Sequence, residues 1–373
     1  MINRESETKE KGRRLPLVAK IFFALGGLSA VLYGIFMLSP SFSDFFNRYI
    51  SSWLRAALAY ATSFIPFSLG EFLIILSPVL LVSIVVVGSI KFSDTWRDVF
   101  VFCGTALSIV ALIFSIFAFG FAPAYRGKGL DQKLGIKRAD VSGEELYATA
   151  LILSEKINEE YKNIAYDKST NFSVMPYGFT EMNDLLIEAY SSACDKYSFV
   201  QRLDSRVKPV MLSELMSYTH ITGVYSFFTG EANINVAFPD YTIPYTAAHE
   251  LSHQRGIARE DEANFMAFLV CMESEDAYIR YSGYLNLFEY VTSALYSASK
   301  DRYRQAIGTL PPQVHFEMQA YSEFFNKYRD STASKVSGVV NDTSLKLQGT
   351  EGTKSYGMVV DLAVAYYKDG IPE

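Results

Sequence analysis

Three long runs of apolar residues without charges occupy the first third of the chain, at residues 21–38, 72–90 and 99–123. Each run reaches the roughly 18 to 20 residues that a helix needs to cross a hydrocarbon core about 30 Å thick. Backbone groups inside lipid have to form hydrogen bonds within their own segment, which favours helices. The pattern therefore predicts a membrane region, residues 1–123, with three transmembrane helices.

The segment between the first two runs, residues 41–71, has a different pattern. Its apolar and aromatic residues recur every three or four positions with charged residues between them, which is typical of an amphipathic helix. Such a helix can lie at the membrane surface or pack as a lid against a soluble domain, and the spacing fits both. The residues that set this spacing are Phe45, Phe46, Tyr49, Ile50, Trp53, Leu54, Ala57 and Leu58.

Basic residues are concentrated before the first apolar run. The positive-inside rule then places the N-terminus in the cytoplasm, and three spans place everything after residue 123 outside it. No A-x-A-like cleavage site follows the first run, so we expect a retained anchor instead of a cleaved signal. The basic residues are Arg4, Lys9, Lys11, Arg13, Arg14 and Lys20 before the first run, Arg48 and Arg55 in the first loop, and Lys91 and Arg97 in the second.

Residues 124–373 have the mixed polar and apolar pattern of a globular domain. Ser142 and Glu145 form an S-x-x-E capping box, which predicts a helix that extends to about residue 164. The domain should be mostly α, an α+β fold with one small sheet. The other predicted elements are helices at 183–197 and 209–219, strands at 223–230 and 232–238 around a glycine-containing turn, and further helices beyond residue 241.

Charge and cysteine content exclude some classes of function. The formal net charge is −6 and the Lys and Arg residues after residue 125 are scattered, so we expect no nucleic-acid surface. The three cysteines are far apart and form no CxxC pair, which favours their packing as small apolar residues.

The motif His-Glu-Leu-Ser-His at residues 249–253 carries the clearest chemistry. Residues four apart share one face of a helix, so His249 and His253 can both point at one metal ion. Glu250 lies between them, where it can take a proton from an attacking water and return it to a leaving amine. The same five-residue motif also occurs by chance on ordinary helices whose two histidines bind no metal. The predicted strand before this helix favours the metal site.

A catalytic zinc site needs a third protein ligand. Arg259 stands where a longer HExxHxxGxxH motif has its third histidine, and it cannot bind a metal. The helix that begins at Glu260 resembles the gluzincin arrangement, in which an E-x-x-A-D/N stretch on a second helix supplies a carboxylate ligand. The resemblance implies that Glu260 is the ligand and that Asn264 forms a hydrogen bond to a ligand histidine, although gluzincins usually have more chain between the two motifs. Glu262 is the alternative ligand, and compensation of the helix dipole also explains these acidic residues.

Residues outside the motif are candidates for contact with a substrate. The predicted strand from residue 231 to 238 is a candidate for the edge strand with which zincins bind an extended peptide. Its polar residues Glu231, Asn233 and Asn235 alternate and therefore share one face, either for substrate or for solvent. Candidates for stabilising an oxyanion are His220, Tyr225, Tyr245 and Arg255.

The stretch 245–264, which contains the HExxH motif, resembles a family of bacterial membrane proteins catalogued as a domain of unknown function (number 3810) and grouped with zincin-like peptidases. Segments 66–71 and 230–235 resemble the same family, so the likeness covers most of the chain. It implies membrane helices, a metal site and a location in the bacterial cell membrane. It implies no substrate.

The sequence thus predicts three membrane helices and an extracytoplasmic, zincin-like (gluzincin-type) domain at residues 124–373. We expect Zn²⁺ held by His249, His253 and Glu260, with Glu250 as general base for hydrolysis of a polypeptide near the membrane surface. The lipid bilayer is the expected partner. The rival interpretations are a membrane signalling receptor that cleaves only itself and a structural protein with a degenerate site. Transport is disfavoured because the three runs carry no charge.

Overall fold

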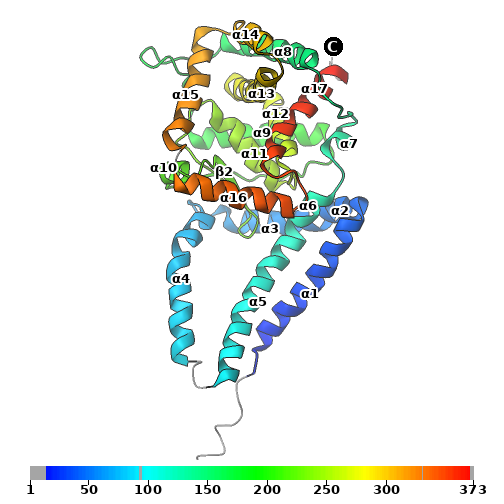
Figure 1. Cartoon of the computed structure of the whole chain (residues 1–373), viewed down its shortest axis with the longest axis vertical. Helices are drawn as coiled ribbons and strands as arrows, with labels where there is room; N and C mark the ends of the chain where they lie inside the picture. The colour runs from blue at the N-terminus through cyan, green and yellow to red at the C-terminus, as the bar shows by residue number, and fades with distance from the viewer. Residues whose placement is uncertain (1–13, 92–94, 330, 370–373) are drawn as a thin grey trace, which may run out of the picture.

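The computed structural model describes residues 14–91, 95–329 and 331–369, so Arg4, Lys9, Lys11 and Arg13 lie outside the described residues. Each apolar run lies in one long helix: α1 (Leu17–Leu38), α4 (Leu69–Lys91) and α5 (Trp96–Gly120). All three are long and apolar enough to cross a membrane. They extend from one side of a helical domain (Figure 1).

The third helix ends at Gly120, three residues before the end of its apolar run. Phe121 has a non-helical backbone, and the short helix α6 (Ala122–Arg126) starts directly after it with Pro123 in its first turn. Proline is well suited to a first helical turn because its missing N–H has no partner there in any case. The chain therefore changes direction where it leaves α5.

The segment after α1 forms α2 (Pro40–Phe46), a π-helical turn (Asn47–Ser51) and α3 (Ser52–Ser63). These helices lie across the ends of the long helices, beneath the helical domain (Figure 1). Arg55 points inward and is buried, whereas Trp53 and Phe64 are exposed. One side of this segment thus packs against the domain, and the opposite side has an exposed aromatic face.

The helical domain surrounds helix α11 (Thr242–Gln254), in which every residue is buried. The capping box of Ser142 and Glu145 is confirmed at the start of α8, but the predicted helix at 209–219 shrinks to α10. The other helices are α7 (Leu130–Leu134), α8 (Gly143–Tyr161), α9 (Phe179–Lys196), α10 (Ser213–Ser217), α12 (Glu260–Met272), α13 (Ala277–Ala298), α14 (Lys300–Ile307), α15 (Pro312–Tyr328), α16 (Thr332–Leu347), the 3₁₀ turn Gly352–Met358 and α17 (Val359–Asp369).

A small mixed sheet lies beside α11. Its strands are β1 (Lys208–Pro209), β2 (Gly223–Ser226) and β3 (Glu231–Ile234). The strand order is β1-β3-β2, with β3 parallel to β1 and antiparallel to β2. The prediction that residues 231–238 form an edge strand is therefore wrong, because β3 is the central strand and β2 lies at the edge.

The polar residues of β3 and its extension are buried instead of facing solvent. The Asn233 amide donates to the carbonyl of Val224, and the Asn235 amide donates to the hydroxyl of Ser217. Glu231 accepts backbone N–H groups from Leu69 and Gly70, at 3.0 and 2.9 Å, in the first turn of α4. Alternation along the strand was correctly predicted, but the shared face points into the protein.

Glu231 joins the sheet to the long apolar helix α4. Its carboxylate also forms an ion pair of 2.6 Å with Lys208 of β1. A carboxylate at the N-terminus of a helix satisfies free N–H groups and interacts favourably with the helix dipole. This one buried side chain therefore fixes the start of α4 against β1 and β3.

We predict that Glu231→Ala lowers the free energy of unfolding of the detergent-solubilised chain by about 2 to 4 kcal/mol, because it removes one partner of a buried ion pair and a helix cap. Chemical denaturation measures the change. The control is Glu214→Ala on α10, where the side chain is exposed. Equal stabilities of the two variants would contradict this role of Glu231.

Candidate metal centre

The turn between α11 and α12 brings two parts of the candidate site together. α11 ends at Gln254 and α12 begins at Glu260, so only five residues connect them. Gly256 has a φ of +85°, a conformation that favours glycine. A Cβ atom there would also lie 2.4 Å from an Arg55 nitrogen. Backbone conformation and close packing both require glycine at this turn.

The turn places Glu260 opposite the two histidines. Glu260 Oε2 lies 3.2 Å from His249 Nε2 and 3.4 Å from His253 Nε2. All three side chains are buried, and their ligand atoms lie within 4.8 Å of one another. Ligand atoms at about 2.1 Å from a tetrahedral zinc ion are roughly 3.4 Å apart. The three groups therefore fit a metal ion.

Electrostatic interactions in this cluster are strong. Burial opposes the charge on Glu260, but the two histidines outweigh it and hold the pKa of that carboxyl well below its usual range. Burial likewise opposes the charged form of His253, but Glu260 outweighs it and raises the pKa of that imidazole to about 9. The opposite charges of Glu260 and His253 thus attract each other across the cluster.

The histidines differ in their outer contacts. His253 Nδ1 lies 2.8 Å from the carbonyl oxygen of Ile257, in the turn after α11. This contact directs Nε2 toward Glu260, as the outer hydrogen bond of a ligand histidine does. His249 Nδ1 is buried without a hydrogen-bond partner among the described residues.

Asn264 does not form the predicted hydrogen bond to a histidine within the described part of the chain. Its Nδ2 is buried without a partner. Its backbone carbonyl accepts the Tyr245 hydroxyl at 2.9 Å. Asn264 therefore connects α12 to α11.

Glu262 points away from the cluster. Its Oε1 accepts the N–H of Leu130 at 3.0 Å and lies 2.9 Å from Arg259 Nη1. These contacts connect α12 to the start of α7. Of the two candidate carboxylates, Glu260 is the one that lies with the histidines.

Glu250 lies between the cluster and the edge strand. Burial raises the pKa of Glu250 to about 7, although the neighbouring histidines lower it and the N–H of Tyr225 donates to its carboxyl group. A Cβ atom on Gly223 would lie 2.5 Å from Glu250 Oε1. The first residue of β2 thus has to be glycine for Glu250 to keep this position.

The four candidates for stabilising an oxyanion differ in their contacts. Tyr245 donates to the backbone of α12, Arg255 stacks on Tyr190 and donates to the carbonyl of Leu251, and His220 packs against an aromatic ring of α15. The Tyr225 hydroxyl is buried and has no hydrogen-bond partner among the described residues. Tyr225 is therefore the candidate whose hydroxyl has no partner among the described residues, and Arg55 is the charged group near it.

The end of the long apolar helix α5 forms a wall of the site. The Phe121 ring packs edge-on against His253, with centroids 6.2 Å apart, and against Tyr225 at 5.2 Å. Phe121 also contacts Tyr125, whose pKa is raised by burial and by the charge of Glu260. Neither Phe121 nor Tyr125 was predicted as a site residue. Both lie at or just beyond the end of the third apolar run, for which the sequence pattern predicts only a membrane anchor.

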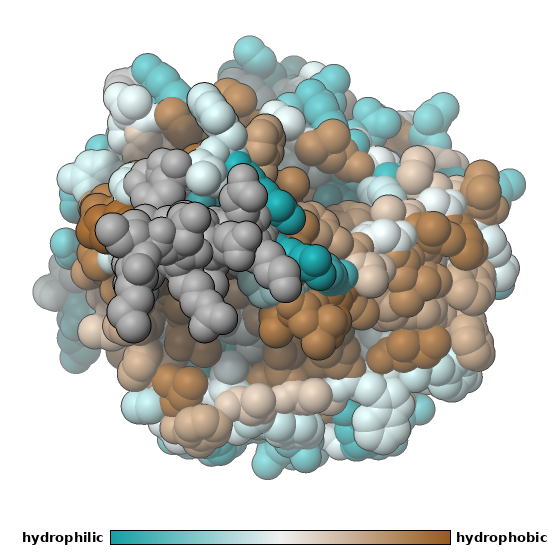
Figure 2. Space-filling model, turned by 90° about the horizontal axis from the view of Figure 1, so that it is seen from below, coloured by the Kyte–Doolittle hydropathy of each residue, from teal (hydrophilic) through white to brown (hydrophobic). Residues whose placement is uncertain are grey.

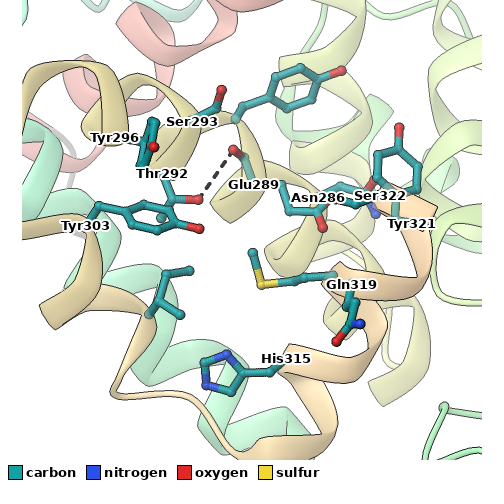
Figure 3. A pocket seen from close by; sticks show the side chains of 13 residues that line it. Asn286, Glu289, Thr292, Ser293, Tyr296, Tyr303, His315, Gln319, Tyr321 and Ser322 are labelled. Carbon is teal, nitrogen blue, oxygen red and sulfur yellow. Dashed lines mark hydrogen bonds between the residues drawn. The ribbon is translucent and has the colours of Figure 1, made fainter. Parts of the chain in front are cut away.

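A cavity of about 700 Å³ lies elsewhere, between α13, α14 and α15 (Figure 3). Its described lining includes Glu289, Tyr303 and His315, but neither Glu260 nor the histidines of the HExxH motif. Burial raises the pKa of Glu289 to about 8, against a hydrogen bond from the Tyr241 hydroxyl that lowers it. The cavity is thus separate from the metal centre.

The fold and site define a class: a helical domain attached to three apolar helices, with a buried His-His-Glu group that can bind a metal ion. The chain belongs to the family described as Protein of unknown function (DUF3810), which matches residues 46–364. No curated protein and no solved structure matches it.

The titration of Glu289 predicts a pH dependence of stability. Its folded pKa is about 8, above the ordinary value of 4.5, so the unfolded chain releases this proton first as the pH rises. The stabilising contribution is complete below about pH 4.5 and is lost as the pH rises toward 8. The unfolding temperature of the Glu289→Gln variant should therefore rise relative to wild type between pH 5 and pH 8. Exposed Glu188→Gln is the control, and a difference that is constant with pH would contradict the assignment.

Proposed function

We propose that this protein is a membrane-attached zinc metallopeptidase. The observation that supports this most is the convergence of His249, His253 and Glu260 at distances that fit one tetrahedral ion, with Glu250 beside them. Two histidines and a carboxylate are the donor set of one class of catalytic zinc sites, which keep a fourth position open. The proposal includes a zincin-like, gluzincin-type arrangement of the two helices.

The donor set also supports zinc as the metal. Imidazole nitrogen and carboxylate oxygen suit a borderline-soft divalent ion, and zinc commonly takes this combination. A zinc ion in such a site acts as a Lewis acid that polarises a peptide carbonyl and makes a water molecule more acidic. The residues of the chain then have to move the protons and position the substrate.

Glu250 is the proposed general base. It takes one proton from the attacking water, and the water oxygen forms a bond to the carbonyl carbon of the substrate. Glu250 then gives the proton to the amine nitrogen as the C–N bond breaks. The proposed donor to the developing oxyanion is the hydroxyl of Tyr225, which has no hydrogen-bond partner among the described residues.

Edge strand β2 is the proposed binding site for the substrate backbone. One side of β2 pairs with β3, and its outer side has no strand partner among the described residues. An extended peptide can add to such an edge by main-chain hydrogen bonds. Because Glu250 contacts β2 through Gly223 and Tyr225, a peptide on this edge would pass beside the general base.

The membrane defines the proposed substrate class. Phe121 at the end of α5 forms a wall of the site, so the metal centre lies close to the membrane surface and a polypeptide at that surface can reach it. The distribution of basic residues, of which Arg14 and Lys20 are in the described chain, supports an extracytoplasmic site. We therefore propose cleavage of polypeptides on the outer side of a bacterial cell membrane.

The metal is tested first on the full chain in detergent, because Arg55 and Phe121 of the membrane region are part of the site. Plasma mass spectrometry should find about one zinc per chain, and His249→Ala or Glu260→Gln should lower this at least tenfold, because each removes a ligand. His315→Ala in the separate cavity is the control and should keep its zinc. A folded wild type that takes up no added zinc would refute the metal site, and a different bound metal would correct its identity.

Catalysis is tested with a library of quenched-fluorescent peptides. Glu250→Gln should retain zinc but lose about 10²- to 10⁴-fold in cleavage rate, because proton transfer fails. Gly223→Ala should also reduce the rate, because its Cβ displaces Glu250, whereas Gly178→Ala, with nothing within 4 Å of the added Cβ, should not. Normal cleavage by the Glu250→Gln variant would contradict the mechanism. Zinc binding without cleavage would favour the structural interpretation.

A further inference from the structure

Helix α16 presents its apolar residues to the outside of the molecule. Of its residues, only Leu345 is buried. Val336, Val339, Val340 and Leu347 have exposed fractions of 58, 68, 63 and 71%. A surface helix of a soluble domain normally turns such residues toward the core. The exposed residues of α16 therefore need another apolar environment.

Helix geometry shows that these residues form one face. With 3.6 residues per turn, Val336, Val339, Val340 and Leu347 fall within about 100° of each other. The opposite face contains buried Leu345 and the partly buried Ser334 and Asn341. The apolar face, defined by Val336, Val339, Val340 and Leu347, thus points directly away from the protein.

The two ends of α16 are attached close to the membrane helices. Before its start, the Ser331 hydroxyl donates to the carbonyl of Tyr218, next to α10, at 2.6 Å. At its end, Arg126 of α6 donates to the carbonyl of Leu347 and to the hydroxyl of Tyr33 in α1. α16 therefore runs across the underside of the domain, at the height of α3 and roughly perpendicular to the long helices (Figure 1).

The segment that precedes and includes α10 continues this apolar surface. Met211 and Leu215 are exposed. The backbone N–H groups of Met211 and Leu212 donate to Glu71 in the first turn of α4, both at 2.9 Å. Seen from the side of the membrane helices, apolar residues extend beyond these helices onto the rim of the domain (Figure 2).

We propose that α16, together with the exposed Met211–Leu215 segment, lies in the interface of the lipid bilayer that surrounds the membrane helices. Continuity with α1 and α4 identifies the bilayer as the occupant of the apolar face. An amphipathic helix in the membrane plane buries one apolar side among the acyl chains. Exposed Lys335 and Lys346 lie along one side of the helix, where their ammonium groups can reach the lipid headgroups. Lys346 also pairs with Asp342 at 2.7 Å. The proposal rests on the membrane helices alone and would stand if the metal centre were inactive.

Spin labels in the full chain, reconstituted into phosphatidylcholine and phosphatidylglycerol vesicles, test this proposal. Cys103 and Cys194 are first replaced by Ala, and labels are attached to Val339→Cys or Val336→Cys. Val85→Cys on exposed α4 is the lipid control, and Ser297→Cys on α13 is the water control. For each label, the ratio of its collision rate with oxygen to its collision rate with a water-soluble nickel chelate is measured. This ratio should be severalfold higher for both α16 labels than for the label at Ser297→Cys.

Two outcomes would overturn the proposal. A ratio for α16 equal to that of Ser297→Cys would show that the apolar face meets water. Low collision with both reagents, together with dipolar broadening between labels on different chains, would show that a second copy covers it. Both positions are exposed, so the labels should not disturb folding, and circular dichroism of each labelled protein checks this.

Discussion

The position of the site depends on one buried guanidinium. Arg55, in the segment between two membrane helices, donates to the side chain of Asn47 at 2.7 Å and to the carbonyl of Gly120 at the end of α5 at 2.9 Å. It also packs against Gly256 in the turn between the two helices of the metal centre, and Asn47 donates to the carbonyl of that glycine. Burial lowers the pKa of Arg55 to about 10, so the group is still charged at neutral pH. Its hydrogen bonds offset the desolvation of this charge.

In this arrangement, the same side-chain contacts hold the long apolar helices and the site in place. The end of α5 contacts a candidate ligand through Phe121, and the start of α4 is held by Glu231 of the sheet that borders Glu250. A shift of either helix would therefore be transmitted to the site by packed side chains. A domain separated from residues 14–123 would lose these contacts, which is why the membrane region belongs to the functional unit.

Much of the fold could be predicted because its signals are local. Apolar runs located the three long helices, the capping box located α8, and the four-residue spacing of His249 and His253 placed both on one face. The failures concern partners far apart in sequence. Alternation in β3 showed which residues share a face but not that β1 would pair on its other side. Likewise, Asn264 was assigned by resemblance, whereas the contact of its backbone carbonyl with the Tyr245 hydroxyl on α11 depends on tertiary packing.

The shortness of the turn at Gly256 has a consequence for how the molecule folds. His249 and Glu260 are only eleven positions apart, so closing the loop between them costs little conformational entropy. The two histidines and the carboxylate can therefore meet as soon as one helical hairpin forms, whereas Gly223 and Phe121 reach the same place only through contacts of high sequence separation, which form slowly. If the group binds a metal ion as proposed, binding can precede completion of the domain, and the bound ion would then act as a nucleus around which the remaining helices assemble.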